Sequence, residues 1–460
     1  MASKRAEWLI KNRYFHNDHY QYMRFLIPRG ASVLDLGCGV GDLLAELKPS
    51  RGVGLDMSEA MVEQARTLNP SMQYHVGDAE SLQSLSDLGG PFDYILLSGT
   101  IGFLDDIEST LESLHELCHK DTRVVIVYYS PLWGPVLKVA ESLGLKMPQP
   151  EQNWLNTESI SGMLELADFD VIKREWRQLI PRRLMFLGTL LNRYLAPLPG
   201  IRRLCLRNYL VARPNRNTGL DEPSATVVVP CKNESGNIEP AVTRLPRFAK
   251  DMEIIFVEGG SQDGTYEEAE RVRDKYADYD IKVIKQPGKG KADAVWHAFD
   301  RARGDILMIL DADLTVPPET LPKFYRAIQA GKGEFINGSR LIYPLEDQSM
   351  RFLNMIANRF FAVVFSWLLN QRFTDTLCGT KVLLKSDYER IKRGRSYFGD
   401  FDPFGDFDLI FGAAKLNLKC VDLPIRYQAR TYGETQISRF RHGMLLFRMV
   451  GYAFRKLKAF

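Results

Sequence analysis

Two groups of glycine and carboxylate residues in this 460-residue chain have the spacing of ligand-binding loops. In the first, VLDLGCGVGDLL (33–44), an apolar segment reaches Asp35 and continues into a glycine-rich turn and a helix-forming stretch. In the second, ILDADLTVPPE (309–319), an apolar segment ends in two aspartates one residue apart. Both patterns are typical of strand ends that present backbone amides or carboxylates to a bound molecule.

The first group favours a nucleotide-like ligand. Gly37, Gly39 and Gly41 are expected in the turn because a Cβ would block close approach of the ligand. Asp56 ends the next strand and is placed to accept hydrogen bonds from two ribose hydroxyls. Asp78 follows the third strand, where a carboxylate suits an adenine amino group. The alternative is a glycine turn that only packs a helix on a strand, and this three-part spacing disfavours it.

The strands that position these groups are short and rich in β-branched residues. In the first half of the chain they alternate with helical patterns and are expected at 32–36, 53–55, 72–76, 94–97, 124–129, 169–179 and 209–212. A polar linker follows, and the alternation restarts at 226–229, 254–257, 282–284, 306–310 and 334–337. This predicts an α/β protein with two doubly wound, parallel sheets and no internal duplication.

The segments VLDLGCGVGDLL, VGLDMS, VGDAE and FDYILLSG together resemble class I methyltransferases that use S-adenosylmethionine (SAM), over about residues 30–215. The resemblance implies a seven-stranded sheet and a SAM site that contains Asp35, Gly37, Gly39, Gly41, Asp56 and Asp78. A NAD-binding domain fits less well, because the first strand ends in the acidic form LDLGCG.

The methyl acceptor stays open at this point, since methyl transfer depends mainly on positioning. His16 and His19 are candidate general bases, although a packed or solvated histidine is the more common case. Tyr128 and Tyr129 follow the fifth strand and are expected either to line the acceptor pocket or to pack.

The second group favours a divalent cation. Alternate residues of a strand point to one side, so Asp311 and Asp313 are predicted to hold one Mg²⁺ or Mn²⁺ ion. Such an ion neutralises a nucleotide diphosphate as it leaves. A lone pair of this kind is common, but here it follows VVVPCKNE (227–234) and EIIFVEGGSQDGT (253–265) in order.

That ordered set resembles the inverting family-2 glycosyltransferases of GT-A fold, over about residues 224–435. INGSRL (336–341), DTLCGTK (375–381) and VDLPIRYQARTYGETQIS (421–438) resemble the polyprenyl-phosphate (dolichol-phosphate) hexose synthases within that family. One departure is clear: the usual Asp-Asp-Gly-Ser is Glu-Gly-Gly-Ser at 258–261, which leaves the base of the donor, uracil or guanine, open.

The resemblance implies a donor site for a UDP- or GDP-linked sugar, built from Pro230, Glu234, Glu258, Lys289, Lys291, Asp311 and Lys381. The lysine-containing loop is alternatively a solvated turn. A lipid-phosphate acceptor needs only cations, which Arg340, Arg430 and Lys381 suit. A sugar hydroxyl needs a general base, for which Asp406 or Asp408 is the candidate, unless both only cap a loop.

Composition bounds the class of protein. With 45% apolar and 25% charged residues, the chain predicts a globular protein of two or three domains. Six cysteines without C-x-x-C spacing fit a reducing cytosol. Residues 1–20 lack the apolar core of a signal peptide, and the most apolar window is too short to span a bilayer.

The net charge of +3 is unevenly distributed, and basic residues are concentrated in two stretches. Residues 177–216 contain nine Arg and no Asp, Glu or Lys, and residues 435–460 contain six Lys or Arg and no acid. The segments 180–209, 350–369 and 440–460 mix apolar residues with these cations, which predicts peripheral contact with a lipid surface. Core helices or an oligomer interface are the alternatives, and no nucleic-acid motif is present.

The resulting prediction is a methyltransferase domain (1–216), a linker (217–223), a glycosyltransferase domain (224–435) and a basic amphipathic tail (436–460). The expected protein is a bifunctional enzyme on the cytoplasmic face of a membrane. It transfers a sugar to a polyprenyl phosphate or other lipid-linked acceptor and methylates a related glycan or lipid intermediate. A soluble polysaccharide glycosyltransferase with a SAM-binding sensor or scaffold domain is the alternative, and the oligomeric state stays open.

Overall fold

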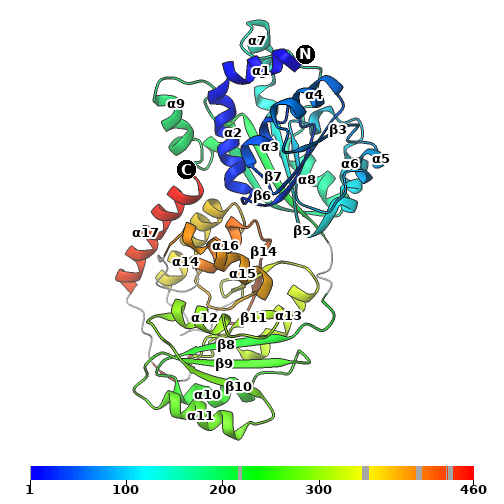
Figure 1. Ribbon diagram of the computed structural model, residues 1–460. Helices are drawn as coiled ribbons and strands as arrows, with labels where there is room; N and C mark the ends of the chain where they lie inside the picture. Colours follow the sequence, from blue (N-terminus) through cyan, green and yellow to red (C-terminus); the bar gives the residue numbers. More distant parts are fainter. Residues whose placement is uncertain are drawn as a thin grey trace. The chain divides into compact units, whose positions relative to one another are not determined.

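The computed structural model describes residues 2–215, 220–343, 352–399, 407–430, 432–433 and 439–459. The chain divides into two compact units (Figure 1). The first comprises Met1–Arg216 together with Lys458–Phe460, and the second comprises Asn217–Leu457. The candidate base Asp406 and most of the segment 431–438 lie outside the described residues.

The first unit is built on a seven-stranded sheet, counted over the described residues, in the order β3-β2-β1-β4-β5-β7-β6. The strands are β1 (Ser32–Leu36), β2 (Arg51–Asp56), β3 (Gln73–Val76), β4 (Phe92–Ser98), β5 (Cys118–Tyr129), β6 (Phe169–Arg177) and β7 (Arg207–Pro214). All neighbours are parallel except β7, which runs antiparallel to both β5 and β6. The prediction of a doubly wound α/β sheet is confirmed, and the sheet is mixed because β7 lies antiparallel between β5 and β6.

Helices cover both faces of this sheet. They are α1 (Ala2–Lys11), α2 (Arg13–Leu26), α3 (Asp42–Leu47), α4 (Glu59–Leu68), α5 (Leu82–Ser86), α6 (Ile107–Ser113), α7 (Gly134–Ser142), α8 (Thr157–Leu166) and α9 (Leu187–Leu190). Side chains of α2, α3 and α4 pack on one face, and those of α5, α6 and α8 pack on the other. The strands are apolar on both sides because neither face of such a sheet meets water.

The second unit contains another seven-stranded sheet, again counted over the described residues, in the order β10-β9-β8-β11-β13-β12-β14. The strands are β8 (Ala225–Cys231), β9 (Met252–Glu258), β10 (Asp280–Lys285), β11 (Ile306–Ile309), β12 (Phe335–Ser339), β13 (Lys381–Leu384) and β14 (Cys420–Pro424). β13 runs antiparallel to β11 and β12, so this sheet is also mixed. Sequence reasoning missed β13 and β14, because four- and five-residue strands leave too little periodicity to detect.

The helices of the second unit are α10 (Ser235–Thr243), α11 (Thr265–Lys275), α12 (Lys291–Phe299), α13 (Leu321–Gln329), α14 (Phe352–Leu369), α15 (Lys385–Gly394), α16 (Phe407–Lys415) and α17 (Arg439–Leu457). Side chains of α10, α11 and α13 form one continuous core with β8, β9 and β11.

The predicted basic tail contains a helix that packs on the second unit's own helices. Its helix α17 packs on α14, where the rings of Phe361 and Phe447 lie 5.1 Å apart and those of Trp367 and Phe454 lie 5.8 Å apart. The residues that follow belong to the first unit. No helix of the described residues is long and apolar enough to cross a membrane.

Candidate active sites

The glycine-rich turn of the first unit joins β1 to α3. Gly37, Gly39 and Gly41 have φ of 76°, 56° and 76°, a left-handed backbone conformation that favours glycine. A Cβ at Gly37 would lie 2.3 Å from Oγ1 of Thr100, and one at Gly41 would lie 2.4 Å from the hydroxyl of Tyr74. At Gly39 nothing lies within 4 Å, so this glycine leaves open space beside the turn.

That open space belongs to a cavity of about 440 Å³. The predicted SAM residues Asp35, Gly37, Gly39, Asp56 and Asp78 all line it, together with residues that follow β4 and β5. Gly41 does not line it and lies behind the turn, against Tyr74. The structure thus brings together groups that the sequence places after three successive strands.

Two of the lining carboxylates are held by backbone amides. Asp56 Oδ2 accepts a hydrogen bond from the Gly39 N–H (2.8 Å), and its Oδ1 accepts one from Ser58 (2.9 Å). Asp78 Oδ1 accepts one from the Glu80 N–H (3.0 Å). These hydrogen bonds orient both side chains. Each carboxylate oxygen has a second lone pair, so both can still accept a hydrogen bond from a ligand.

Asp35 is different, because its buried Oδ1 has no hydrogen-bond partner. Burial, with the nearby charges of Asp42 and Asp56, raises the pKa of Asp35 well above its usual value. A buried carboxylate oxygen that lines a cavity fits a ligand carrying N–H donors or positive charge. SAM carries both an ammonium and a sulfonium group, so the donor set of this cavity fits that cofactor.

His16 and His19 also line the cavity, but they do not suit the base role expected of them. His19 Nδ1 lies 3.0 Å from the Tyr209 hydroxyl, and its Nε2 lies 3.1 Å from Ser98 Oγ. Burial, with the charge of Arg207, lowers the pKa of His16 to about 3 and that of His19 well below its usual value. Both imidazoles are therefore neutral near pH 7 and too weakly basic for general base catalysis.

The two tyrosines after β5 line the same cavity. The Tyr128 hydroxyl donates a hydrogen bond to Thr157 Oγ1 (2.8 Å), which ties it to α8. The ring of Tyr129 lies near Phe15 of α2, with 6.3 Å between the ring centroids. Tyr128 therefore has a packing role, and Tyr129 belongs to an aromatic wall of the cavity.

In the second unit, charged side chains converge behind β11. This strand ends at Ile309, so Asp311 and Asp313 lie in the turn that follows it. The sequence predicts that the alternation of side chains along a strand brings the two carboxylates to one side. Their positions are instead set by the turn after β11. Asp311 Oδ1 pairs with Lys291 Nζ (2.6 Å), and Asp313 Oδ2 pairs with Arg430 Nη2 (2.6 Å).

Arg430 links this turn to the start of α10, since its Nη1 also lies 3.4 Å from Glu234 Oε1. Burial raises the pKa of Glu234, while Arg430 and the hydrogen bond from Asn237 act in the opposite direction. Asn237 Nδ2 donates to the second oxygen of Glu234 over 2.7 Å. Glu234, Asp313 and Arg430 thus form one connected charged group.

Asp311 is surrounded by cations. Burial favours its neutral form, but Lys291, Lys381 and Arg340 outweigh that effect and keep the pKa of Asp311 below its usual value. Gly379 lies directly against this pair, because an added Cβ would be 2.0 Å from Asp311 Oδ2 and 2.4 Å from Lys291 Nζ. The glycine of DTLCGTK is therefore required for close approach of two chain segments.

The carboxylates of this turn fit a divalent cation that arrives with its substrate. No group of three or more His, Cys, Asp or Glu residues is arranged to hold a metal ion in the described part of the chain. Mg²⁺ is commonly held by one or two carboxylates together with substrate phosphates. Asp311 and Asp313 supply that number of carboxylates. In this structure a side-chain cation pairs with each of them, Lys291 with Asp311 and Arg430 with Asp313, and a metal ion would add further positive charge.

The other residues predicted to bind the donor come from β8, β9 and the loop before α12. Pro230 of β8 is opposite Val257 of β9. Glu258 ends β9, is buried, and accepts a hydrogen bond from the Ser261 N–H (2.5 Å). Lys289 is exposed in the loop before α12. Glu258 therefore shapes the loop that carries the Glu-Gly-Gly-Ser departure.

Each unit matches a model of a known family. Residues 8–174 match the model described as methyltransferase domain, and residues 226–389 match the model described as glycosyl transferase family 2. The chain joins a methyltransferase domain to a family-2 glycosyltransferase domain.

Curated relatives match the glycosyltransferase domain. A dolichol-phosphate mannosyltransferase of Saccharomyces cerevisiae is 38% identical over 22% of this chain and 40% of the relative. One of Pyrococcus furiosus is 28% identical over 51% of this chain and 63% of the relative. A low-salt glycan biosynthesis hexosyltransferase of Haloferax volcanii is 28% identical over 48% of this chain and 51% of the relative. The chain thus spans less than two thirds of the length of each of these relatives.

Three residues predicted to act on the acceptor of the glycosyltransferase domain have other partners. Arg340 forms two parallel hydrogen bonds to the buried carboxylate of Asp375 (2.7 and 2.9 Å). Lys381 has no exposed surface and donates to the carbonyl of Cys378. Asp408 pairs with Arg395 (3.3 Å) beside a cavity of about 30 Å³ that neither aspartate of the turn lines. These side chains therefore have partners inside the domain, although Arg340 and Lys381 also act on the charge of Asp311.

Sequence reasoning missed two side chains at the start of α10. Asp263 accepts hydrogen bonds from the Ser235 N–H (3.1 Å) and the Thr265 N–H (3.1 Å), which caps α11 and holds α10 beside it. The Tyr432 hydroxyl lies 2.9 Å from Ser235 Oγ, and its ring packs on Gly236. The sequence Ser-Gln-Asp-Gly-Thr carried a capping signal for Asp263, whereas Tyr432 had none.

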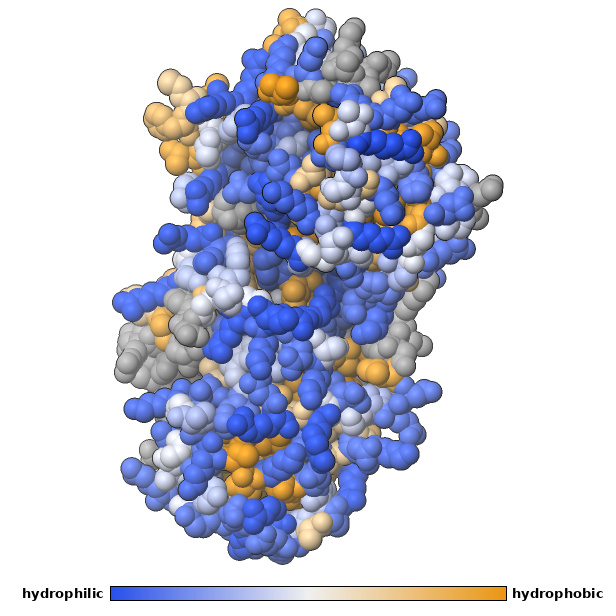
Figure 2. Space-filling view, in the orientation of Figure 1, coloured by the Kyte–Doolittle hydropathy of each residue, from blue (hydrophilic) through white to orange (hydrophobic). Residues whose placement is uncertain are grey.

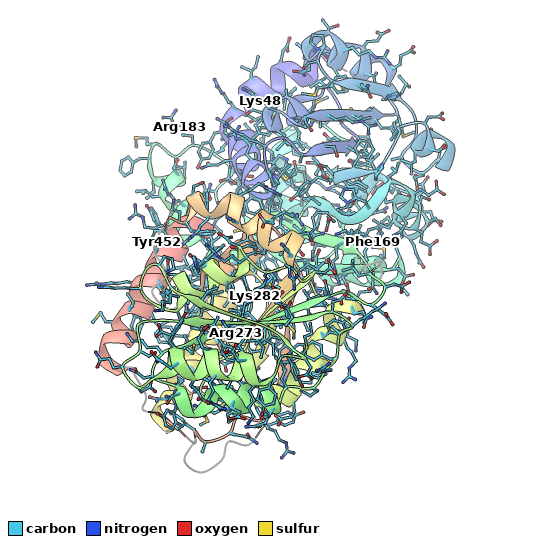
Figure 3. All side chains as sticks on the ribbon, turned by 60° about the horizontal axis from the view of Figure 1, so that its bottom comes forward. Lys48, Phe169, Arg183, Arg273, Lys282 and Tyr452 are labelled. Atoms are coloured by element: carbon cyan, nitrogen blue, oxygen red, sulfur yellow. The ribbon has the colours of Figure 1, made fainter. Side chains whose placement is uncertain are left out.

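Apolar side chains are exposed on both domains. In the methyltransferase domain, the segment around α9 exposes Leu184, Met185, Phe186, Leu187, Leu190 and Tyr194. Figure 2 shows apolar surface over α9, and Arg183, labelled in Figure 3, lies in the same segment. In the glycosyltransferase domain, α14 and α17 together expose Ile356, Phe360, Val363, Met444 and Phe447.

Proposed function

We propose that the glycosyltransferase domain transfers a hexose, with inversion, from a UDP- or GDP-linked sugar to a polyprenyl phosphate or other lipid-linked acceptor. The observation that carries the proposal is the charged group formed by Asp311, Lys291, Asp313, Arg430 and Glu234. It contains two carboxylates for a divalent ion and two cations for phosphate groups. The similarity to dolichol-phosphate mannosyltransferases supports the lipid acceptor.

The roles follow from these contacts. Asp311 and Asp313 hold Mg²⁺ or Mn²⁺, which supplies positive charge to the diphosphate that leaves. Lys291 lies at the N-terminus of α12, where backbone N–H groups also favour an anion, so it contacts the diphosphate. Arg430 is partly exposed beside Asp313 and Glu234, and it is the cation that we assign to the acceptor phosphate. A phosphate acceptor is already ionised, so no side chain has to remove a proton from it.

The exposed apolar surfaces support peripheral attachment to a membrane. The face shared by α14 and α17 carries Phe360, Val363 and Met444 among its exposed side chains, and Arg359 and Arg448 lie on the same two helices. Apolar side chains beside arginine suit the boundary between headgroups and acyl chains. Because this face belongs to the glycosyltransferase domain, a lipid-linked acceptor reaches the domain from the bilayer to which it is bound.

The methyltransferase domain is proposed to methylate a glycan or lipid intermediate of the same route. SAM supplies an electrophilic methyl group when it is bound. The chain's own contribution is the carboxylate cradle of Asp35, Asp56 and Asp78, which orients the cofactor. Both histidines of the cavity are neutral and weakly basic, so neither is assigned as a general base. Methyl transfer therefore depends on how the cavity positions the acceptor beside the methyl group.

The first experiment incubates the full chain with polyprenyl phosphate in detergent, radiolabelled UDP- or GDP-hexose and Mn²⁺. Label should pass into the organic phase with one donor, and Asp313→Ala should abolish this transfer while SAM affinity is unchanged. Label that appears only in a water-soluble glycan would favour the soluble polysaccharide glycosyltransferase instead. Loss of both activities in Asp313→Ala would contradict independent sites.

A second assay follows tritium from methyl-labelled SAM into the product of the first reaction. Transfer to the lipid-linked product is expected. SAM binding without transfer to lipid or glycan would leave the first domain with a sensing or scaffolding role.

A further inference from the structure

The cavity of the methyltransferase domain is lined by side chains of both charges. Its lining carboxylates are Asp35, Asp42, Asp56, Asp78 and Glu80, whereas Arg5 and Arg207 are its lining cations. Both arginines lie near His16, because the positive charge of each lowers the pKa of that imidazole. Carboxylates of the cavity are already assigned to SAM, so the two arginines require an explanation of their own.

Arg207 is a built feature of the wall. It begins β7 and is only 4% exposed, and its guanidinium lies 4.0 Å over the ring of Phe15 and 5.9 Å from the ring of Tyr129. These aromatic contacts hold the guanidinium plane, and a hydrogen bond to the Tyr209 hydroxyl uses part of its donor capacity. The orientation of Arg207 is therefore set by packing, and a guanidinium has further N–H donors for another group.

The charge of Arg207 is not balanced by the protein. Its buried Nε has no hydrogen-bond partner, and no carboxylate of the described residues forms an ion pair with it. By contrast Arg213, in the same strand and equally buried, pairs with Asp170 at 3.0 Å. A buried cation without a counter-ion is costly, and the cost is offset when a ligand brings the anion.

The neighbours of Arg207 strengthen this point. Both imidazoles that line this part of the cavity are neutral near pH 7, as argued above, so they add no competing charge. His19 is hydrogen-bonded to Tyr209 and Ser98, and a neutral imidazole supplies no negative charge to balance a guanidinium. The positive charge that acts on these two histidines comes from the arginines.

We propose that Arg207, with Arg5, binds an anionic group of the methyl acceptor, so that the acceptor carries a carboxylate or a phosphate. This inference rests on the proposed methyltransferase activity and names the class of its substrate. The anion is held by the planar guanidinium, and the atom that receives the methyl group faces the cofactor that the lining carboxylates hold. A neutral glycan lacking an acidic group would leave Arg207 uncompensated.

The test uses the full chain saturated with S-adenosylhomocysteine and titrated calorimetrically with three probes. Glucuronic acid represents a carboxylate, glucose 6-phosphate represents a phosphate, and glucose is the neutral match. The variants are Arg207→Met, Arg207→Lys and the control Arg24→Met, which removes an exposed arginine that pairs with Glu46 on the surface. Binding of S-adenosylhomocysteine reports that each variant is folded.

The wild type and Arg24→Met should bind one anionic probe about 10-fold or more tightly than glucose, because a charge-assisted hydrogen bond is lost with the neutral probe. Whether glucuronic acid or glucose 6-phosphate is preferred identifies the anion. Arg207→Met should lose the preference and keep its affinity for S-adenosylhomocysteine within about 3-fold. Arg207→Lys should keep part of the preference, since it retains the charge without the planar fork.

Two results would overturn the inference. If Arg207→Met weakens S-adenosylhomocysteine binding about 10-fold and leaves the probes unaffected, Arg207 holds the carboxylate of the cofactor itself. If glucose and both anionic probes bind the wild type equally, Arg207 and Arg5 do not select an anion. Failure of the wild type to bind S-adenosylhomocysteine at all is a separate outcome, which removes the proposed methyltransferase function.

Discussion

The Asp35 carboxylate combines a functional role with a cost in stability. It is buried beside Asp42 and Asp56, and these surroundings raise its pKa well above the usual value. A raised pKa in the folded state means that the contribution of Asp35 to stability is greatest below its ordinary pKa. That contribution is lost as the pH rises through the folded-state pKa. The ionised form of Asp35 is therefore destabilised in the ligand-free protein, and a cationic ligand offsets that cost.

Asp35→Asn should therefore separate stability from binding. At a pH above the folded-state pKa of Asp35, the ligand-free variant should unfold at a higher temperature than the wild type, because the buried charge is gone. Its SAM affinity should fall about 10-fold or more, since a hydrogen bond to a charged group is lost. In the wild type, SAM affinity should rise with pH through the raised pKa of Asp35, and in the variant this dependence should disappear.

Thermal unfolding and calorimetric titration between about pH 5.5 and about pH 8.5 check both statements. Equal SAM affinity in the two proteins across this range would show that Asp35 has no part in cofactor binding.

Gly379 makes a similar test possible in the glycosyltransferase domain. Gly379→Ala should reduce sugar transfer about 10-fold or more, because the added Cβ would displace Asp311 and Lys291, and small misplacements of reacting groups cost about 100-fold in rate. Gly394→Ala is the matched control, since nothing lies within 4 Å of a Cβ at that position. Rates measured with saturating Mn²⁺ and donor decide the matter. A Gly379→Ala enzyme with wild-type rate would mean that the Asp311–Lys291 pair does not take part in transfer.

At the scale of elements, α14 and α17 show how two segments far apart in the sequence form one surface. Their contact is aromatic, with the rings of Phe361 and Phe447 5.1 Å apart, and Phe360 lies at its exposed margin. Figure 3 labels Tyr452 of α17, whose hydroxyl donates to the carbonyl of Phe398 and ties the helix to the domain. The exposed apolar face is therefore held by a rigid support rather than by an isolated helix.

Glutamate substitutions on this face should weaken membrane attachment. Val363 is 69% exposed and Met444 is 61% exposed, so the double substitution Val363→Glu and Met444→Glu leaves the core intact. Each exposed apolar side chain that enters a bilayer contributes about 1.5–3 kcal/mol, so liposome binding should fall at least about 10-fold. Leu166→Glu on α8, at a position 67% exposed, is the control. Flotation with anionic liposomes measures the effect, and unchanged flotation of the double variant would remove this face as the contact.

At the scale of the whole chain, the last residues complete the first unit. Lys458 has no exposed surface, and its Nζ pairs with the buried Glu175 at 2.7 Å. Arg193 Nε donates to the carbonyl of Ala459 (2.8 Å). Burial lowers the pKa of Lys458 to about 8, although Glu175 acts in the opposite direction. The fold of the methyltransferase domain therefore depends on residues that follow the glycosyltransferase domain in the chain.

Lys458→Met should destabilise the methyltransferase domain by about 3–5 kcal/mol, because it leaves Glu175 charged and buried without its ammonium partner. Adding Glu175→Gln should restore much of that stability, since neither charge then remains. Urea unfolding followed at each domain's own transition measures both effects. Equal stability of Lys458→Met and the wild type would show that the last residues do not support the first unit.

A pH effect follows from the same pair. Because the folded-state pKa of Lys458 is depressed to about 8, the folded state releases its proton more readily than the unfolded chain does. The destabilisation is present in full below about pH 8 and fades as the pH rises toward the ordinary lysine pKa. As the pH rises from about 8 toward the ordinary lysine pKa, the wild type should therefore gain stability relative to the double variant Lys458→Met, Glu175→Gln.

Local patterns were sufficient for the parts of this protein that depend on neighbours in sequence. The strands β1 to β12, the glycine turn and the carboxylates at strand ends follow from β-branched runs and from glycines that need left-handed backbone angles. The first sheet's seven strands were implied by resemblance and are confirmed. The cluster of Asp35, Asp56 and Asp78 could be anticipated because parallel strands end at one edge of a sheet.

The tertiary structure alone decided which charges meet. Arg430 and Asp313 are 117 residues apart, and His19 and Tyr209 are 190 residues apart, so no periodicity connects them. The pairing of Arg340 with Asp375 and the burial of Lys381 and Asp408 changed the expected roles of these residues. Residue types and spacing determine which strands and turns form and which groups stand at their ends. The field that each group experiences is set by partners and burial, which exist only after distant segments pack together.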